Sequence, residues 1–216
     1  MGLDSWVGSV DLTTPAGELL QKLVAALPTD RHFTITVFGS APLQINIDDE
    51  DLNQYVKRAG LAQGEADFYI QVCSGLNFRT SPHWANRAKS ISLGHCTIRF
   101  PHPIDILIAK LNRMDEKDFE AFRVVIRKTG HPTEAELIHE LQMAVDLFRP
   151  GFDEEQGHDM ANNCRRLWPV IFGREIDPRT EIIAPALQKR REGYGEPTRD
   201  YKQELRDAVA SYGKSG

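Results

Sequence analysis

The sequence predicts an α+β protein in which an α/β core is followed by a C-terminal helical bundle. Two observations lead to this fold class. Between residues 14 and 102, helical patterns alternate with short runs rich in β-branched and aromatic residues, whereas the periodic segments after residue 103 have helical spacing. A chain that mixes helices and strands first and continues with helices is typical of a sheet-containing core with helices packed on it.

The length of the chain sets its domain organisation. It has 216 residues, of which 41% are hydrophobic and 26% are charged. A chain of this size buries roughly two thirds to three quarters of its unfolded surface, which suits a globular protein of one domain. We expect residues 1–102 to form the α/β core, residues 103–150 the helical part of the same domain, and residues 151–216 a helical extension.

Composition and charge exclude several classes of protein. The apolar runs are far shorter than the ~20 residues of a membrane span, and residues 1–10 lack a basic region followed by a long apolar one. A net charge of −5 is unlike that of a nucleic-acid binder. Three widely spaced cysteines suit neither a disulfide framework nor a zinc site. We therefore expect a cytoplasmic protein without a membrane partner.

The first part of the chain carries signals for one helix and several strands. Thr14 stands in a capping position and Pro15 in the first turn of an apolar pattern that predicts a helix over residues 14–27. Runs of β-branched and aromatic residues predict strands. These lie at residues 33–39, 67–73 and 96–100, with residues 89–93 as a candidate hairpin partner of the last.

The second part of the chain is predicted to be helical. Apolar residues recur there at helical spacing, with Asp115 as an N-cap, Thr133 and Glu136 in capping-box spacing, and Gly130 as a stop. The predicted helices are residues 103–113, 115–130, 131–148, 160–172 and 199–212.

The stretch ITVFGSAPLQINIDDEDL, residues 35–52, is the first with chemical interest. Gly39 and Ser40 end a buried strand and would open a short helix at residues 41–45. Glycine lets the backbone approach a ligand closely, and exposed amides at a helix N-terminus favour an anion, so a phosphate is one candidate ligand. The alternative interpretation is a plain turn.

The acidic residues that follow also allow two interpretations. The two-residue spacing of Asn46 and Asp48 points both side chains to one face of an extended segment, where, with a third oxygen ligand, they would hold Mg²⁺. In the alternative, Asp48 or Asp49 caps a helix, and Glu50 and Asp51 complement the positive end of its dipole.

A loop later in the core, NFRTSPHW at residues 77–84, also has two interpretations. Its mixture of arginine, hydroxyl and aromatic side chains suits the binding of a phosphate or the stacking of a base. The alternative is a structural loop capped by serine and proline.

Two stretches of the sequence resemble a known family. TVFGSAPLQI followed by NID resembles the signature of the nucleotidyltransferase superfamily with the polymerase-β-like core, in which a hydrophobic strand runs into Gly-Ser and a later strand carries Asp-x-Asp. PHPIDILIAKLNRMDEKDFEAF resembles the helical part of bacterial members related to abortive-infection toxins. The resemblance covers about residues 30 to 150. The matching residues in the second segment are Asp105, Lys110, Arg113, Lys117 and Asp118.

The resemblance implies a small mixed β-sheet and a Mg²⁺-dependent transfer of a nucleoside monophosphate from a nucleoside triphosphate to a hydroxyl acceptor. The acceptor would be an RNA, a protein or a small molecule. In this reaction the protein mainly positions the reactants and neutralises charge. The implied site comprises Gly39 and Ser40 at the phosphates, Asp48 and Asn46 at the metal, and Asp48, Lys110 and Asp118 in catalysis.

Within this implied site, Lys110 is the cationic partner and Asp118 orients that lysine or an acceptor. Asn46 stands where the family has its first aspartate, and a neutral amide adds no charge toward a divalent cation. The alternative is therefore a catalytically degenerate protein of the same fold. It would serve as a binding or regulatory module with a protein partner, in a bacterial defence or toxin-antitoxin context.

Overall fold

The computed structural model describes residues 11–40, 43–47, 51–65, 67–73, 78–112, 114–148 and 159–194, with the backbone alone at Ser40, Leu43, Asn46 and Ile47. These residues form eight α-helices and one five-stranded sheet. In chain order the elements are α1 (Pro15–Ala26), β1 (Phe33–Ser40), β2 (Leu43–Ile47), α2 (Leu52–Arg58), β3 (Ile70–Val72), α3 (Trp84–Arg87), β4 (Lys89–Leu93), β5 (Cys96–Phe100), α4 (Pro103–Leu111), α5 (Glu116–Thr129), α6 (Glu134–Met143), the 3₁₀ turn η3 (Val145–Phe148), α7 (Met160–Phe172), the π-helical turn η5 (Arg179–Ile183) and α8 (Ala184–Tyr194).

The sheet is mixed and open. Its strand order is β3-β2-β1-β5-β4, with β1 antiparallel to β2 and parallel to β5. The outer strands β3 and β4 pair in parallel with β2 and antiparallel with β5. A mixed sheet together with these helices confirms the predicted α+β class.

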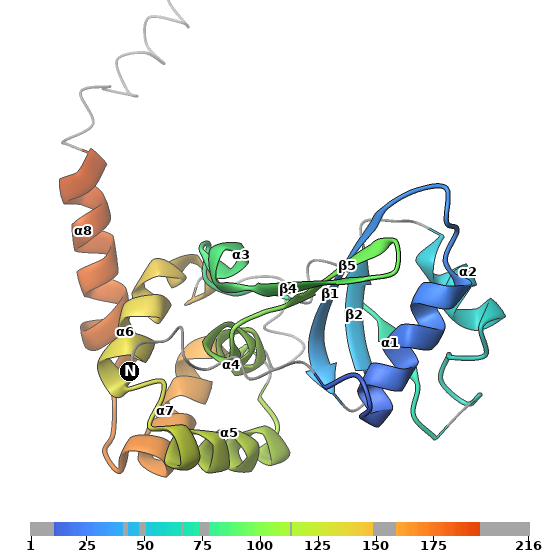
Figure 1. Ribbon diagram of the computed structural model, residues 1–216. Helices are drawn as coiled ribbons and strands as arrows, with labels where there is room; N and C mark the ends of the chain where they lie inside the picture. Colours follow the sequence, from blue (N-terminus) through green and yellow to red (C-terminus); the bar gives the residue numbers. More distant parts are fainter. Residues whose placement is uncertain are drawn as a thin grey trace, which may run out of the picture.

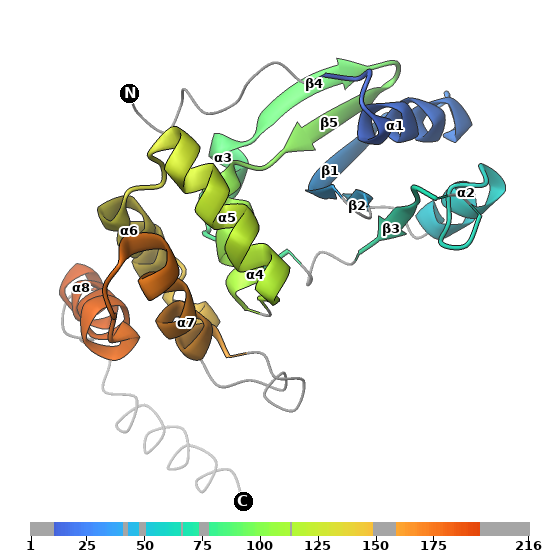
Figure 2. The same cartoon turned by 90° about the horizontal axis from the view of Figure 1, so that it is seen from below.

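The molecule has a sheet part and a helical part, each with its own hydrophobic core. Figure 1 shows α1 and α2 beside the sheet and α4 to α8 on the other side of it. In the view of Figure 2, α3 lies at the start of β4, where the sheet meets the helices. The first core joins α1 and α2 to the sheet, and the second joins α4, α5, α6 and α7. None of the described helices is both long and apolar enough to cross a membrane.

Most of the predicted helices are confirmed, and their capping residues explain their bounds. Thr14 accepts a hydrogen bond from the backbone N–H of Gly17 at the start of α1, and Thr133 accepts one from Glu136 at the start of α6. Gly130 ends α5 in the left-handed region with φ 73°. The helix predicted over residues 199–212 lies outside the described residues.

The short helix predicted at residues 41–45 is wrong. Residues 43–47 instead form β2, which returns antiparallel along β1. Ile45 pairs with Val37 and is fully buried in the core beneath the sheet. Burial of alternate apolar side chains on one face of a sheet therefore outweighs the helix-opening signal of the Gly-Ser pair.

Two further predictions need adjustment. The helix α2 is confirmed, but Asp51 occupies its N-cap without a side-chain capping hydrogen bond, while Asp48 and Asp49 lie outside the described residues. The strand predicted over residues 67–73 is only the three residues of β3. The helix α8 continues directly from η5.

Candidate functional site

The end of β1 carries the predicted phosphate-binding residues Gly39 and Ser40. A β-bulge between Val37 and Gly39 precedes them, and Gly39 lies opposite Gln44 of β2. A Cβ atom at position 39 would lie 2.6 Å from Oε1 and 2.9 Å from Cβ of Gln44. Close packing of Gln44 thus requires glycine here, whether or not a ligand binds.

The hairpin does not bring the predicted phosphate-binding and metal-binding residues to one end. Ser40 pairs with Leu43 beside the turn, whereas Asn46 pairs with Thr36 farther along the strands. At about 3.3 Å per residue, Asn46 lies about 10 Å from the Leu43 end of the hairpin. Asp48, predicted as a metal ligand and catalytic residue, lies outside the described residues.

The helical part does bring Lys110 and Asp118 together. Lys110 is in the last turn of α4 and Asp118 in the first turn of α5. Lys110 Nζ lies 2.5 Å from Asp118 Oδ1, and the side chains are 34% and 13% exposed. The second carboxylate oxygen, Oδ2, accepts a hydrogen bond of 3.3 Å from the backbone N–H of Asp115. Asp118 therefore fixes the start of α5 with one oxygen and holds the lysine with the other.

Helix α7 supports this corner between α4 and α5. The buried amide of Asn163 donates a hydrogen bond of 2.8 Å to the backbone carbonyl of Leu111 at the end of α4. Arg166, one turn later, places its guanidinium 4.7 Å from the ring centroid of Phe119 and forms an ion pair with Glu116. Contacts from one helix to both sides of the corner restrict the relative positions of Lys110 and Asp118.

A second group of charged residues lies where the sheet meets the helices. We call Thr80, Ser81, Arg87, Asp105 and Glu140 the buried polar cluster. Two nitrogens of Arg87 donate to the two carboxylate oxygens of Asp105 at 3.1 and 2.7 Å, and its third lies 3.0 Å from Glu140 Oε2. Thr80 donates to Asp105 at 3.1 Å and Ser81 to Glu140 at 2.8 Å.

In this cluster, burial and the neighbouring charges have opposite effects on the pKa of Arg87. Ser81 and Asp105 are fully buried and Glu140 is nearly so. Burial acts to lower the pKa of Arg87, but the hydrogen bonds and negative charges of Asp105 and Glu140 outweigh it and raise that pKa. The guanidinium is consequently held in its charged form between two carboxylates.

Sequence reasoning missed Arg87 and Glu140, although a signal for the cluster was present. Asp105 shares α4 with the buried residues Ile104 and Ile108, and Glu140 is adjacent to the buried Leu141 on α6. A carboxylate among the buried positions of an amphipathic helix requires a buried partner. That rule predicts a cation for each acid, but it does not identify Arg87.

The described residues offer no ready-made metal centre. Among them, no group of three or more histidine, cysteine, aspartate or glutamate side chains could hold a metal ion. The donors that the resemblance implies are the amide oxygen of Asn46 and the carboxylate of Asp48. Oxygen donors are of the right kind for Mg²⁺, which proteins often hold with one or two carboxylates together with substrate phosphates. The side chain of Asn46 and the whole of Asp48 lie outside the described parts of the chain, so a Mg²⁺ site at these residues stays a prediction.

Comparisons of the chain with protein-family models, with curated proteins and with solved structures found no match.

Proposed function

We propose that this chain is a nucleotidyltransferase-like protein, which binds a nucleoside triphosphate and transfers its nucleoside monophosphate to a hydroxyl acceptor with Mg²⁺. The contact between Lys110 and Asp118 carries the proposal, because the resemblance assigns these two residues to one site and their charged groups lie 2.5 Å apart. The order of β1, Gly39-Ser40 and a return strand that carries Asn46 adds support.

The proposed reaction is an in-line displacement at the α-phosphorus. The acceptor hydroxyl gives up its proton to water, its oxygen forms a bond to that phosphorus while the bond to the bridging oxygen breaks, and pyrophosphate leaves. Bound Mg²⁺ would neutralise phosphate charge and activate the acceptor hydroxyl. Lys110 would bind the phosphates as a cation, and Asp118 would keep its ammonium group directed toward them. The backbone at Gly39 and Ser40 would contact the same phosphates.

A second function is favoured by a specific observation. Asn46 is neutral and lies about 10 Å from the Ser40 end of the hairpin. A metal site with few negative charges, distant from the phosphate-binding turn, suits a degenerate nucleotidyltransferase fold. Such a protein would bind a nucleotide, or a protein partner, without performing the transfer.

Binding of a non-hydrolysable triphosphate, measured by calorimetry with and without Mg²⁺, tests both functions. For the enzyme we expect Mg²⁺ to strengthen binding, Asp48→Ala to abolish that dependence, and Lys110→Met to weaken binding about tenfold or more. Asp30→Ala and Lys22→Met, at exposed positions on the sheet part, are matched controls that should leave binding unchanged.

The two functions give different results. Mg²⁺-independent binding that survives Asp48→Ala, together with no transfer of label from an α-labelled triphosphate, would establish the degenerate module. Absence of triphosphate binding under both conditions would contradict the nucleotide-binding role altogether.

A further inference from the structure

Three aromatic residues form a row outside both hydrophobic cores. The rings of Phe38 and Phe78 are stacked, with centroids 5.0 Å apart and planes at 26°. Phe78 and Trp84 meet edge to face, with centroids 5.2 Å apart and planes at 85°. We call Phe38, Phe78 and Trp84 the aromatic row. Among the described residues, neither hydrophobic cluster includes any of the three.

Phe38 follows the core residue Val37, so the alternation of the strand directs it to the opposite face of the sheet. Val37 pairs with Ile45 and Gly39 with Gln44, so Phe38 is the extra residue between them. On that face Phe38 packs on Phe78. Because Phe38 precedes Ser40 by two residues, their Cα atoms lie within about 7 Å of each other. One end of the aromatic row therefore adjoins the proposed phosphate-binding turn.

The buried polar cluster holds the other end of the row. Between Phe78 and Trp84, Thr80 and Ser81 donate hydrogen bonds to buried carboxylates on α4 and α6. Arg87, which follows Trp84 in α3, bonds to both carboxylates. These bonds tie the segment between Phe78 and Arg87 to α4 and α6. They hold Phe78 and Trp84 in place.

Phe38 is buried, so a ligand would contact the other two rings of the row. Phe78 and Trp84 are half-buried. Since their planes are almost perpendicular, Phe78 covers at most one face of the indole. A planar group that enters beside Ser40 would meet aromatic rings already held in position. Bases stack on such rings whatever their identity, and larger ring systems stack more strongly.

We propose that the aromatic row binds the nucleobase of a purine nucleoside triphosphate. The inference rests on the proposed function only for the phosphates, which the turn at Gly39 and Ser40 would bind; base stacking depends on the row alone. A stacked base typically raises affinity about tenfold or more. Adenosine and ATP should therefore bind through the row, whereas inorganic tripolyphosphate should not.

Tryptophan fluorescence of the full chain provides the measurement. Trp168 is fully buried, and its indole N–H donates to Glu134, so a bound base should quench Trp84. A Trp6→Phe background removes the tryptophan that lies outside the described residues. We expect adenosine and ATP to quench the signal, cytidine to do so more weakly, and tripolyphosphate to have no effect. Further replacement by Trp84→Phe should abolish the quenching.

Calorimetry with a variant pair separates stacking from structural damage. Phe78→Leu should weaken adenosine and ATP about tenfold and leave tripolyphosphate affinity unchanged, while Phe78→Tyr should bind like the parent. Phe172→Leu removes a different aromatic contact, with Trp168 in the helical core, and should not alter binding. Equal affinity for ATP and tripolyphosphate, or an equal loss of both in Phe78→Leu, would overturn the proposal.

The remaining outcomes distinguish this proposal from the proposed function. If adenosine binds through Phe78 but tripolyphosphate does not bind, the base site stands and the phosphate site fails. If tripolyphosphate binds and adenosine does not, the phosphate site stands and the base site fails. If neither binds, both are wrong.

Discussion

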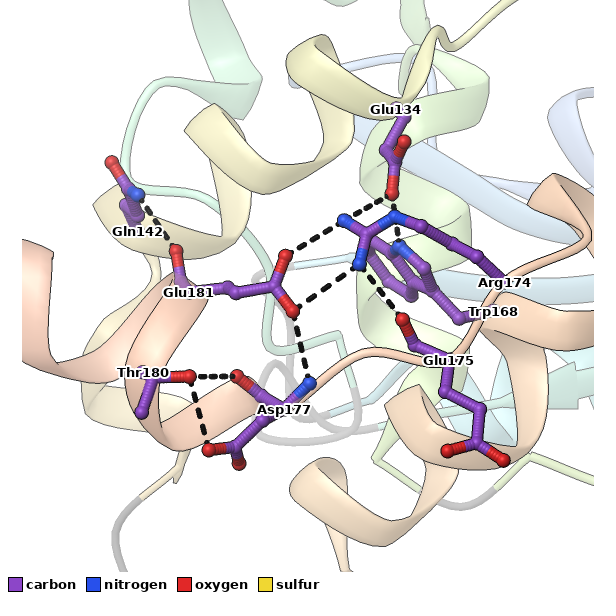
Figure 3. Close-up of polar contacts among 8 residues, drawn as sticks. All are labelled: Glu134, Gln142, Trp168, Arg174, Glu175, Asp177, Thr180 and Glu181. Carbon is purple, nitrogen blue, oxygen red and sulfur yellow. Dashed lines mark hydrogen bonds and ion pairs between the residues drawn. The ribbon is translucent and has the colours of Figure 1, made fainter.

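Two clusters in this protein each place one arginine between two carboxylates, and they differ in how far they are buried. In the buried polar cluster, Arg87 lies between Asp105 and Glu140, and the three side chains are 17%, 0% and 9% exposed. In the other cluster, Arg174 lies between Glu134 and Glu181, and these side chains are 41%, 33% and 34% exposed. We call these three residues the exposed cluster. Figure 3 shows that Arg174 also donates to the backbone carbonyl of Glu175. Each cluster joins one guanidinium to two carboxylates.

The difference in burial determines what each cluster does. Water can replace the partners of Arg174, so this exposed cluster contributes little to stability and mainly fastens the end of α7 to α6 and η5 (Figure 3). Water has little access to Asp105 and Glu140, and loss of Arg87 would leave two buried carboxylates without a cation. The buried polar cluster thus fixes α3 against α4 and α6, and with it the aromatic row.

The largest effect should come from Arg87→Leu. Removing the cation from a buried group destabilises a protein by about 3–5 kcal/mol, because the partner charges stay desolvated. Urea unfolding at neutral pH measures this loss, with Arg174→Leu as the matched variant of the exposed cluster. Equal shifts of the two unfolding midpoints would show that burial does not distinguish the clusters.

A smaller loss is expected for Gly39→Ala. The added methyl group would overlap Gln44 at 2.6 Å, and overpacking of this kind costs about 1–3 kcal/mol. Gly193→Ala in α8 is the control, since a Cβ atom there meets nothing within 4 Å. Gly193→Ala should leave thermal stability unchanged or raise it slightly, because alanine is favoured over glycine within a helix. If both variants lose stability equally, the close contact with Gln44 is not the reason for glycine at position 39.

The smallest effect concerns pH and the exposed cluster. Hydrogen bonds from Arg174, and then from the backbone N–H of Asp177, lower the pKa of Glu181 below its usual value. A carboxylate whose pKa is lowered by folding contributes stability above its unfolded pKa of about 4.3, and the contribution disappears as the pH falls through the folded pKa. Glu181→Gln should therefore be slightly less stable than the parent at pH 7 and equally stable near pH 3. A difference that is independent of pH would contradict this assignment.

Local signals predicted much of this fold because their causes are local. The capping box of Thr133 and Glu136 and the stop at Gly130 depend on residues within one or two turns. The helix at residues 41–45 was predicted wrongly because the formation of β2 depends on pairing with β1, which a Gly-Ser-Ala-Pro sequence does not reveal. The bulge at Phe38 likewise depends on how Gln44 fits against Gly39.

The candidate sites also include residues that the sequence predicted and residues that it did not. The resemblance led us to expect Lys110 and Asp118 in one site, and they are in contact at the α4–α5 corner. Arg87 gave no sequence signal, because it lies in a short helix and its partners belong to α4 and α6. The composition of residues 77–84 suggested base stacking, but it could not predict the aromatic row, because the row also requires Phe38 from β1.

The most direct test of a nucleotide site is a crystal structure of the protein with Mg²⁺ and a non-hydrolysable ATP analogue. We predict that one triphosphate contacts both the backbone N–H of Ser40 and Nζ of Lys110, with the adenine against Phe78 and Trp84. A triphosphate bound elsewhere, or a separation of Ser40 and Lys110 that a single triphosphate cannot span, would contradict the account.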